Sequence, residues 1–569
     1  MKQQHLTFEE YPLHVPSEKK VVKKLESLIQ ELEECGSANT AKVAIKHWNK
    51  FMNELATDMQ IITVRYTIDT TNPVYKDAQD KLDEISPLIS NYSSKYEKIL
   101  LKAPYRKELE KLYGPYLFKM YENGLKAFDE KIIPELIEEN KLTSKYDEIM
   151  GGAQILFRGE TYNLSQLGKF CSSEDRQTRK EASIAMDNWL GEHEKEIAEV
   201  YDKLVHLRDE MAKKLGFKNF VELGYLRLGR TDYDAKMVVG YRAQIKQDVV
   251  PLAQKLFKKQ MKELGIKNPQ TYDYNLKFKT GNPKPVGDSV LLTKIAKSMY
   301  EDMSKESSEF INFMIDGHLL DLDARKGKAP GGYCTYFPVY KAPFIFSNFN
   351  GTEGDVNVLC HEGGHAFQAY LSSPIKIPEY QEPTMESAEI HSMSMEFFTW
   401  PYMDRFFGKD AEKYRYAHLT DAIEFLPYGI TIDEFQHWVY EHPNATHEER
   451  CAKYLEIERA NLPNRKYDDC PIAAKGTRWM RQSHVFGSPF YYIDYTLAQV
   501  VAFQFLEEDL KNHERAWKKY VKLCKFGGSL PFTGLLNKVH LRNPFESGNV
   551  KKNIKPLLKV LKEFDVEKF

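Results

Sequence analysis

Residues 358–367 read VLCHEGGHAF, and this stretch decides how the rest of the chain is interpreted. It has the character of a helix interior, yet it contains two adjacent glycines, Gly363 and Gly364, between two histidines. Each glycine in a helix interior costs roughly 0.5–1 kcal/mol relative to alanine. Because an ordinary surface helix gains nothing from them, we expect another backbone or a substrate to approach this helix closely.

The two histidines have the spacing of a metal site. If Asp355 is the N-cap of a helix here, His361 and His365 lie one turn apart on the same face. Two imidazoles so placed can bind one zinc ion, and Glu362 stands where a carboxylate reaches a metal-bound water, the pattern His-Glu-x-x-His. Two surface histidines beside a glutamate remain the alternative, because a chain with 16 histidines can match so short a pattern by chance.

A catalytic zinc needs a third protein ligand. Residues 383–400, PTMESAEIHSMSMEFFTW, predict a helix in which Glu389, Ser392 and Glu396 form a polar stripe at i, i+3 and i+7 among apolar positions. Burying an unpaired carboxylate is costly, so these carboxylates should be paired or bound to metal. Glu389 is the predicted third ligand and Glu386 its main competitor, while Glu396 or Glu386 could orient a ligand instead. His391 points off the stripe and is interpreted as a packing residue.

At this point the sequence resembles a known family. GTEGDVNVLCHEGGHAFQAY (351–370) followed by ESAEIHSMSME (386–396) resembles the thimet oligopeptidase and oligoendopeptidase F family of zinc peptidases. The Gly-rich segment at 330–352 and FGGSLPFTGLL at 526–536 extend the resemblance to roughly residues 190–569, closest to the Pz-peptidase-like branch. It implies one Zn²⁺ per chain on His361, His365 and Glu389, with Glu362 as the catalytic carboxylate. Gly364 matches the family glycine, whereas Gly363 stands where a larger residue is common.

A second constellation lies in residues 481–503, RQSHVFGSPFYYIDYTLAQVVAF. If this stretch is one helix, His484, Tyr492 and Tyr495 share a face, with Tyr491 slightly offset, although Pro489 interrupts the region. With 34 tyrosines in the chain, a core role is the alternative for each of them. The resemblance implies that His484 and Tyr495, and with them Tyr492, donate hydrogen bonds to the oxyanion of a tetrahedral intermediate.

The remaining pattern predicts a mostly α fold. Helical periodicity runs through the first 200 residues, and residues 271–288 predict an irregular segment or a hairpin. The aromatic, Gly-rich residues 321–352 predict a small β-sheet beside the zinc helix. The resemblance implies a multi-helical zincin-type metallopeptidase with a deep substrate channel between helical lobes. We expect an N-terminal helical lobe over residues 1–190 and the catalytic region over residues 191–569.

The composition indicates which binding partners and which cellular compartment to expect. A net charge of −2 provides no global field for nucleic acid, and no apolar run reaches the ~18 residues of a membrane span. The N-terminus lacks the apolar core of a signal peptide, and the seven scattered cysteines favour a reduced, cytoplasmic setting. Oligopeptides are the expected partners, nucleic acid and membranes are not, and the sequence does not determine the oligomeric state.

The predicted function is zinc-dependent hydrolysis of internal bonds in short oligopeptides, with Glu362 as general base toward a zinc-activated water. The strand-like run APFIFSNF (342–349) could pair with an extended substrate. Two alternatives remain: a zinc exopeptidase of the carboxypeptidase or dipeptidyl carboxypeptidase type, and a non-catalytic helical scaffold with a relic site.

Overall fold

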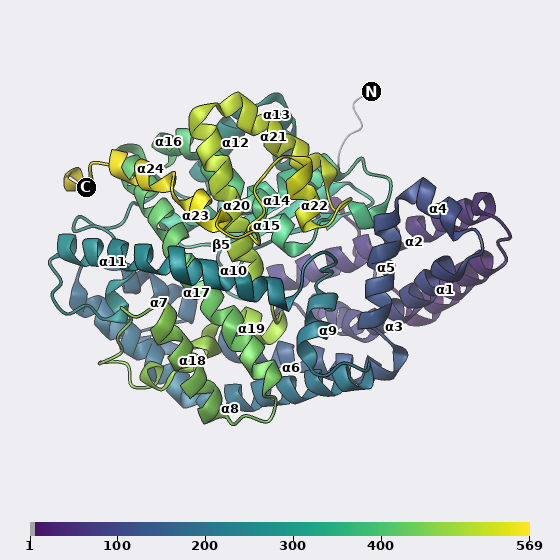
Figure 1. The fold of residues 1–569 in the computed structure, drawn as a ribbon, viewed down its shortest axis with the longest axis horizontal. Helices are drawn as coiled ribbons and strands as arrows, with labels where there is room; N and C mark the ends of the chain where they lie inside the picture. Colours follow the sequence, from purple (N-terminus) through teal and green to yellow (C-terminus); the bar gives the residue numbers. More distant parts are fainter. Residues whose placement is uncertain (1–5, 330) are drawn as a thin grey trace.

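The computed structural model describes residues 6–329 and 331–569 and confirms the mostly α class. Residues 1–5 and Pro330, which belong to the N-terminal and Gly-rich stretches discussed above, lie outside the described residues. In Figure 1 the first five helices form an arm at one end of the molecule, and the later helices build the larger body.

The arm has its own apolar core. Its helices are α1 (Glu18–Glu33), α2 (Ala38–Ile68), α3 (Pro73–Lys102), α4 (Arg106–Tyr113) and α5 (Pro115–Ala127). Within that core Trp48 of α2 stacks on Tyr96 of α3 with ring centroids 4.3 Å apart. Helix α1 follows the predicted periodicity and ends at Glu33, with Glu34 as its C-cap.

The first helices of the body continue the pattern. They are α6 (Ile133–Gly151), α7 (Leu164–Gly168), α8 (Arg176–Lys214), α9 (Phe220–Arg227), α10 (Ala235–Asp248), α11 (Val250–Leu264), α12 (Ser289–Met303) and α13 (Lys305–Asp316). Of residues 271–288, predicted to break the helical pattern, Thr271–Asp273 form a 3-10 helix and residues 274–288 contain no regular helix or strand. The sequence pattern missed a short hairpin, β1 (Ile155–Phe157) with β2 (Glu160–Tyr162), whose turn holds Arg158 and Gly159 at positive φ.

The predicted small sheet is present, but its order corrects one expectation. The strands are β3 (Leu320–Asp323), β4 (Tyr333–Phe337) and β5 (Ala342–Phe349), in the order β3-β5-β4. The stretch APFIFSNF is β5, the central strand, which is parallel to β3 and antiparallel to β4. Its backbone is therefore already paired along both edges. Its side chains are almost all buried, on both faces of the sheet, which explains its nearly continuous apolar sequence. Strands β3 and β4 are the two edge strands, and β4 is the one that begins next to Glu362, where a peptide could pair with it.

Three helices carry most residues of the predicted site. Helix α14 (Glu353–Ser372) packs on β5 and on α15 (Met385–Phe398), and α15 also packs on α20 (Tyr492–Lys511). Helix α14 begins two residues before the predicted N-cap, with Thr352 as its own N-cap. Asp355 is not the cap, because its carboxylate accepts the backbone N–H groups of Asn350 and Gly351 at 2.9 and 2.7 Å.

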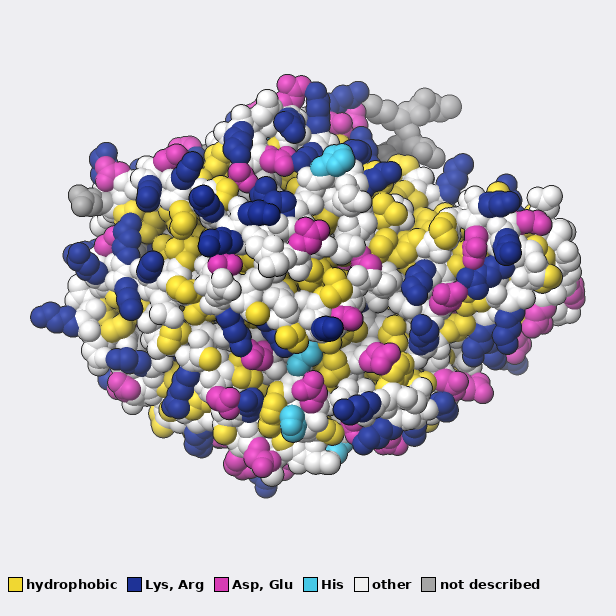
Figure 2. Space-filling model, in the orientation of Figure 1, with side chains coloured by type: hydrophobic (Ala, Val, Ile, Leu, Met, Phe, Trp, Pro, Cys, Tyr) yellow, Lys and Arg dark blue, Asp and Glu magenta, His cyan; other side chains and the backbone are white. Residues whose placement is uncertain are grey.

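The other helices complete the body around α14, α15 and α20. They are α16 (Met403–Phe407), α17 (Ala411–Glu441), α18 (His447–Asn461), α19 (Ser483–Gly487), α21 (His513–Phe526), α22 (Phe532–Lys538), α23 (Asn549–Ile554) and α24 (Leu557–Glu563). On the face in Figure 2, acidic and basic side chains are interspersed. None of the helices in the described residues combines the length and apolarity needed to cross a bilayer.

The two adjacent glycines have different neighbours. A Cβ on Gly364 would lie 2.6 Å from the Cα of Ser392 and 2.7 Å from the carbonyl oxygen of His391, both on α15. A Cβ on Gly363 would lie 2.3 Å from the hydroxyl of Tyr300, on α12. The expected backbone approach is therefore present at Gly364, whereas a tyrosine side chain occupies the space at Gly363. Gly364 lets α14 and α15 come close enough to share one site.

We expect Gly364→Ala to lower both stability and zinc affinity. The added methyl group meets backbone rather than a flexible side chain, so α14 and α15 must separate, and overpacking of this kind costs about 1–3 kcal/mol. Thermal unfolding and zinc titration measure the two effects. Gly240→Ala in α10 is the matched control, since a Cβ on Gly240 would meet nothing within 4 Å, and it should be neutral or stabilising. Equal changes in melting temperature and zinc affinity in the two variants would contradict the packing argument.

Candidate active site

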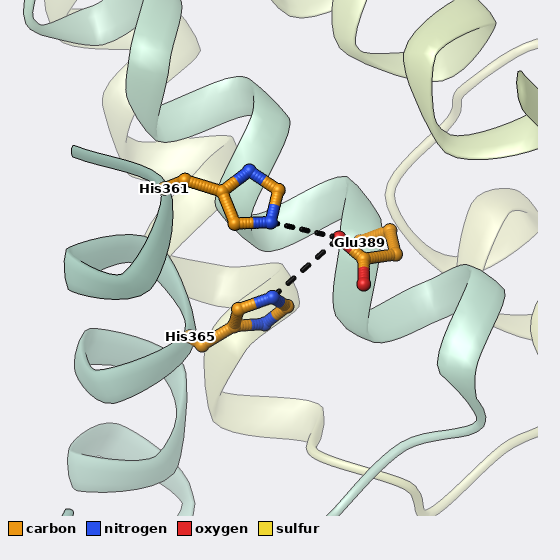
Figure 3. A group of neighbouring side chains, drawn as sticks. All are labelled: His361, His365 and Glu389. Carbon is orange, nitrogen blue, oxygen red and sulfur yellow. Dashed lines mark ion pairs between the residues drawn. The ribbon is translucent and has the colours of Figure 1, made fainter. Parts of the chain in front are cut away.

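His361, His365 and Glu389 converge in the structure. Their nitrogen and carboxylate ligand atoms lie within 4.8 Å of one another, and no other group of three or more potential ligands is found among the described residues. The Nε2 atoms of His361 and His365 lie 3.1 and 3.5 Å from the same oxygen, Oε2 of Glu389. Figure 3 shows the two imidazoles of α14 facing the carboxylate of α15. Two imidazoles and one carboxylate form a donor set that suits zinc and leaves a coordination position open.

Neighbouring hydroxyl groups orient Glu389. Ser392 donates to Oε2 at 2.9 Å, and Tyr491 donates to Oε1. Burial acts to raise the pKa of the Glu389 carboxyl, but the charges and hydrogen bonds of His365 and His361 outweigh it and hold this pKa well below its ordinary value. The carboxylate is thus charged and fixed in direction, as a metal ligand must be.

A hydrogen-bond chain sets the tautomer of His361. Its Nδ1 lies 2.7 Å from Oε1 of Glu396, whose Oε2 lies 2.6 Å from Nε2 of His418. The indole N–H of Trp400 donates to Nδ1 of His418 at 3.0 Å, so the proton of His418 is on Nε2 and is donated to Glu396. Burial opposes ionisation of Glu396, but these hydrogen bonds lower its pKa to about 2. The ionised carboxylate therefore accepts Nδ1–H of His361 and leaves Nε2 for a metal.

Glu362 is buried beside this centre without a partner. It is not among the three converging ligands, and no hydrogen bond or ion pair of its carboxylate occurs within the described residues. Burial raises its pKa, the neighbouring carboxylates Glu389 and Glu396 raise it further, and the two histidines oppose the shift. The start of β4 lies close to it, since a Cβ on Gly332 would be 3.9 Å from Glu362 Oε1. A carboxyl group with raised pKa next to the edge strand is suited to accept and return a proton.

His484 and Tyr495 lie together, although they are not on one helix. His484 is on α19 and Tyr495 on α20, and between them Pro489 and the positive φ of 67° at Phe490 turn the chain. The conditional expectation of one continuous helix is therefore wrong. Nε2 of His484 still lies 3.1 Å from the hydroxyl of Tyr495, because α19 folds back against α20. The side-chain amide of Gln482 donates to Nδ1 of His484 at 2.8 Å, which places the proton of this imidazole on Nε2.

One cavity of about 360 Å³ joins the two groups of residues. Its lining includes His361, Glu396, His484, Tyr492 and Tyr495. The ring of Tyr492 packs against other aromatic rings, with its centroid 5.7 Å from that of Tyr428. Its assignment as a hydrogen-bond donor to substrate stays a prediction.

The competing candidates lie elsewhere. Glu386 is buried, accepts a hydrogen bond from Thr384 at 2.6 Å, and is near Arg230 rather than near His361 and His365. His391 bonds the carbonyl oxygen of Ser387 at 2.6 Å, and burial lowers its pKa to about 4, so it is neutral. These contacts agree with a packing role for His391.

Three residues of the site were missed from the sequence. Tyr491 was noted only as offset from a predicted face, yet it bonds Glu389. His418 and Gln482 carried no signal, because their partners are 22 and 2 residues away at spacings that match no motif. The approach of α17 to α15 identifies His418, and the local turn at the start of α19 identifies Gln482.

Comparison with known proteins agrees with this geometry. Residues 8–128 match the model of the peptidase M3 N-terminal domain, and residues 170–553 match that of peptidase family M3. Among curated proteins no match is found.

Solved structures of similar proteins cover nearly the whole chain. A provisional oligoendopeptidase F is 46% identical with a TM-score of 0.97, covering 99% of this chain and 100% of the other. PZ peptidase A with a bound inhibitor is 47% identical, with a TM-score of 0.97 and coverage of 98% and 100%. A provisional oligoendopeptidase F from Bacillus anthracis str. Ames is 44% identical, with a TM-score of 0.93 and full coverage of both chains.

These matches confirm the resemblance and the predicted enzyme class, a metalloendopeptidase. With the family model spanning 384 residues from 170 to 553, the chain belongs to peptidase family M3.

Proposed function

We propose that this protein is a cytoplasmic zinc endopeptidase that hydrolyses internal bonds of short oligopeptides. The observation that carries the proposal is the convergence of His361, His365 and Glu389 beside the unpaired Glu362, with His361 and the His484–Tyr495 pair lining one cavity. The similarity to PZ peptidase A and to provisional oligoendopeptidases F supports the substrate class.

The residues present fit a single zinc ion. The buried Glu389 carboxylate is ionised and held by Ser392 and Tyr491, and His361 presents Nε2 because Glu396 holds its Nδ1–H. Zn²⁺, when bound by these groups, supplies Lewis acidity that activates water and polarises a peptide carbonyl.

The side chains of the protein perform the proton transfers. Glu362 takes a proton from the attacking water as that water adds to the peptide carbonyl, and then gives it to the leaving nitrogen. Tyr495 and His484 donate hydrogen bonds to the carbonyl oxygen, which gains negative charge in the transition state. The edge strand β4, which begins next to Glu362, can hold an extended peptide through its backbone.

The test is cleavage of a short peptide with an acetylated N-terminus and an amidated C-terminus. An endopeptidase cuts it internally and loses activity when zinc is removed by a chelator. An exopeptidase requires a free terminus and therefore leaves the blocked peptide intact. A non-catalytic scaffold leaves every peptide intact. Absence of internal cleavage by the zinc-loaded protein would overturn the proposal.

We expect Tyr495→Phe to lower kcat by about 10²–10³-fold while KM stays within a few fold, since removing one oxyanion donor has that effect. The ring is retained, so packing against the rings of Tyr491 and Tyr492 should survive. Steady-state kinetics on the blocked peptide and thermal unfolding of the same variant distinguish a catalytic role of Tyr495 from a structural one. A lowered melting temperature with an unchanged kcat would show that Tyr495 is a core residue.

A further inference from the structure

The chain between α19 and α20 turns at Phe490, which has a positive φ of 67° although it is not a glycine. Its side chain is fully buried. A residue with a Cβ adopts this conformation at a cost, and it persists only where the surrounding structure holds it. Because the turn joins the helix of His484 to the helix of Tyr495, the contacts of Phe490 determine how these two side chains meet.

Both backbone groups of Phe490 have buried side-chain partners. Its N–H donates to Oε1 of Gln436, on α17, at 3.0 Å. Its carbonyl oxygen accepts from Nη2 of Arg230, between α9 and α10, at 2.7 Å. The same nitrogen donates to Oδ1 of Asp494, in the first turn of α20, at 2.6 Å, and both of these side chains are fully buried. Arg230 therefore ties the turn to the helix that follows it.

The ring of Phe490 is enclosed as well. Its centroid lies 4.8 Å from that of His437 and 5.3 Å from that of Tyr440, both on α17. Gly224 of α9 also faces this ring, since a Cβ there would lie 2.6 Å from one of its carbons. The side chain and both backbone groups of Phe490 are thus all held, and the turn is fixed.

Three side chains of the site depend on this turn. Tyr491, the next residue, donates to Glu389, and Tyr495 lies one helical turn farther along α20. His484 reaches the Tyr495 hydroxyl from the other side of the turn, at 3.1 Å. Within the described residues Arg230 makes no hydrogen bond to any of these three side chains, so its influence on them passes through the turn.

We propose that Arg230 and Gln436 are positioning residues for the hydrolysis. By holding the two backbone groups of Phe490, they keep His484 against Tyr495, so that both can donate to the carbonyl oxygen of the scissile bond. This inference rests on the proposed function, because it requires that the His484–Tyr495 pair acts on the substrate. Loss of either hydrogen bond should lower kcat more than it changes KM, since the pair acts mainly in the transition state.

The first test is Arg230→Lys. The lysine keeps the positive charge that the buried Asp494 requires, but a single ammonium replaces the planar guanidinium. On the blocked peptide kcat should fall about 10- to 100-fold, the size of effect that follows from misplacing a reacting group by about 1 Å. KM should stay within a few fold, and zinc content should stay at that of the parent.

Gln436→Met is the second test, and it acts on the other side of Phe490. It removes the acceptor of the Phe490 N–H without changing any charge, and it should give the same pattern of kcat and KM. It also tests the turn if Arg230→Lys does not fold, which thermal unfolding of each variant shows.

Repeating both substitutions in the Tyr495→Phe background separates positioning from a general loss of stability. If they act through the pair, most of their effect on kcat should disappear once residue 495 has no hydroxyl to position. An effect on stability alone would lower kcat by the same factor in both backgrounds.

Arg179→Lys is the matched control. Arg179 is likewise a buried arginine that bonds a backbone carbonyl and an aspartate, at 2.7 Å from the oxygen of Ser173 and 2.9 Å from Asp273, but it lies at the start of α8. Its substitution should leave kcat unchanged, even where the melting temperature falls.

An unchanged kcat in either variant that folds, equal factors in the two backgrounds, or loss of zinc would overturn the inference and leave the proposed function intact. Full activity of Tyr495→Phe alone would instead remove the pair from the mechanism, and the inference with it. Absence of internal cleavage by the unaltered zinc-loaded enzyme would refute the proposed function itself.

Discussion

Replacing Glu362 with glutamine should lower kcat on the blocked peptide by about 10²–10⁴-fold, the usual contribution of a general acid–base group. The amide keeps the shape of the carboxyl but cannot take a proton from water. Zinc content should stay at one ion per chain, because Glu362 is not among the three converging ligands. Metal analysis and steady-state kinetics on the same preparation measure both quantities.

The exposed Glu514→Gln on α21 is the charge-matched control and should behave like the parent. Burial favours the neutral form of residue 362, so the glutamine variant should be at least as stable as the parent. Loss of zinc from Glu362→Gln, or turnover close to that of the parent, would contradict the assignment of a general base.

Glu389→Ala should weaken zinc binding by more than about 100-fold, since even the loss of a supporting group around a metal site costs 10–100-fold. The variant removes the carboxylate that faces both His361 and His365. Glu386→Ala, which empties a buried position on the same helix, should change zinc affinity by less than about tenfold, because its carboxylate contacts Thr384 instead and supports no metal ligand.

Equilibrium zinc titration against a competing chelator measures both variants, and thermal unfolding shows that each remains folded. The decisive result is which of the two variants binds zinc more weakly. If Glu386→Ala emerges metal-free while Glu389→Ala still binds zinc, the third ligand is wrongly assigned.

Local sequence determined the parts of the site that one helix contains. The four-residue spacing of His361 and His365 and the stripe of Glu389, Ser392 and Glu396 follow from about 3.6 residues per turn, whatever surrounds the helices. The apolar and glycine-rich composition of residues 321–352 likewise indicated a sheet before any contact was known. The family motif then followed from the residues alone.

Tertiary structure decided every relation between elements that are distant in sequence. Gly364 shows why: the sequence signals that something approaches α14, but only packing identifies it as the α15 backbone, and at Gly363 as the Tyr300 hydroxyl. The order β3-β5-β4 and the bond from Tyr491 to Glu389 depend on the same long-range packing. Periodicity fixes which side of a helix or strand a residue occupies, whereas the identity of its neighbour depends on how whole elements bury their apolar faces together.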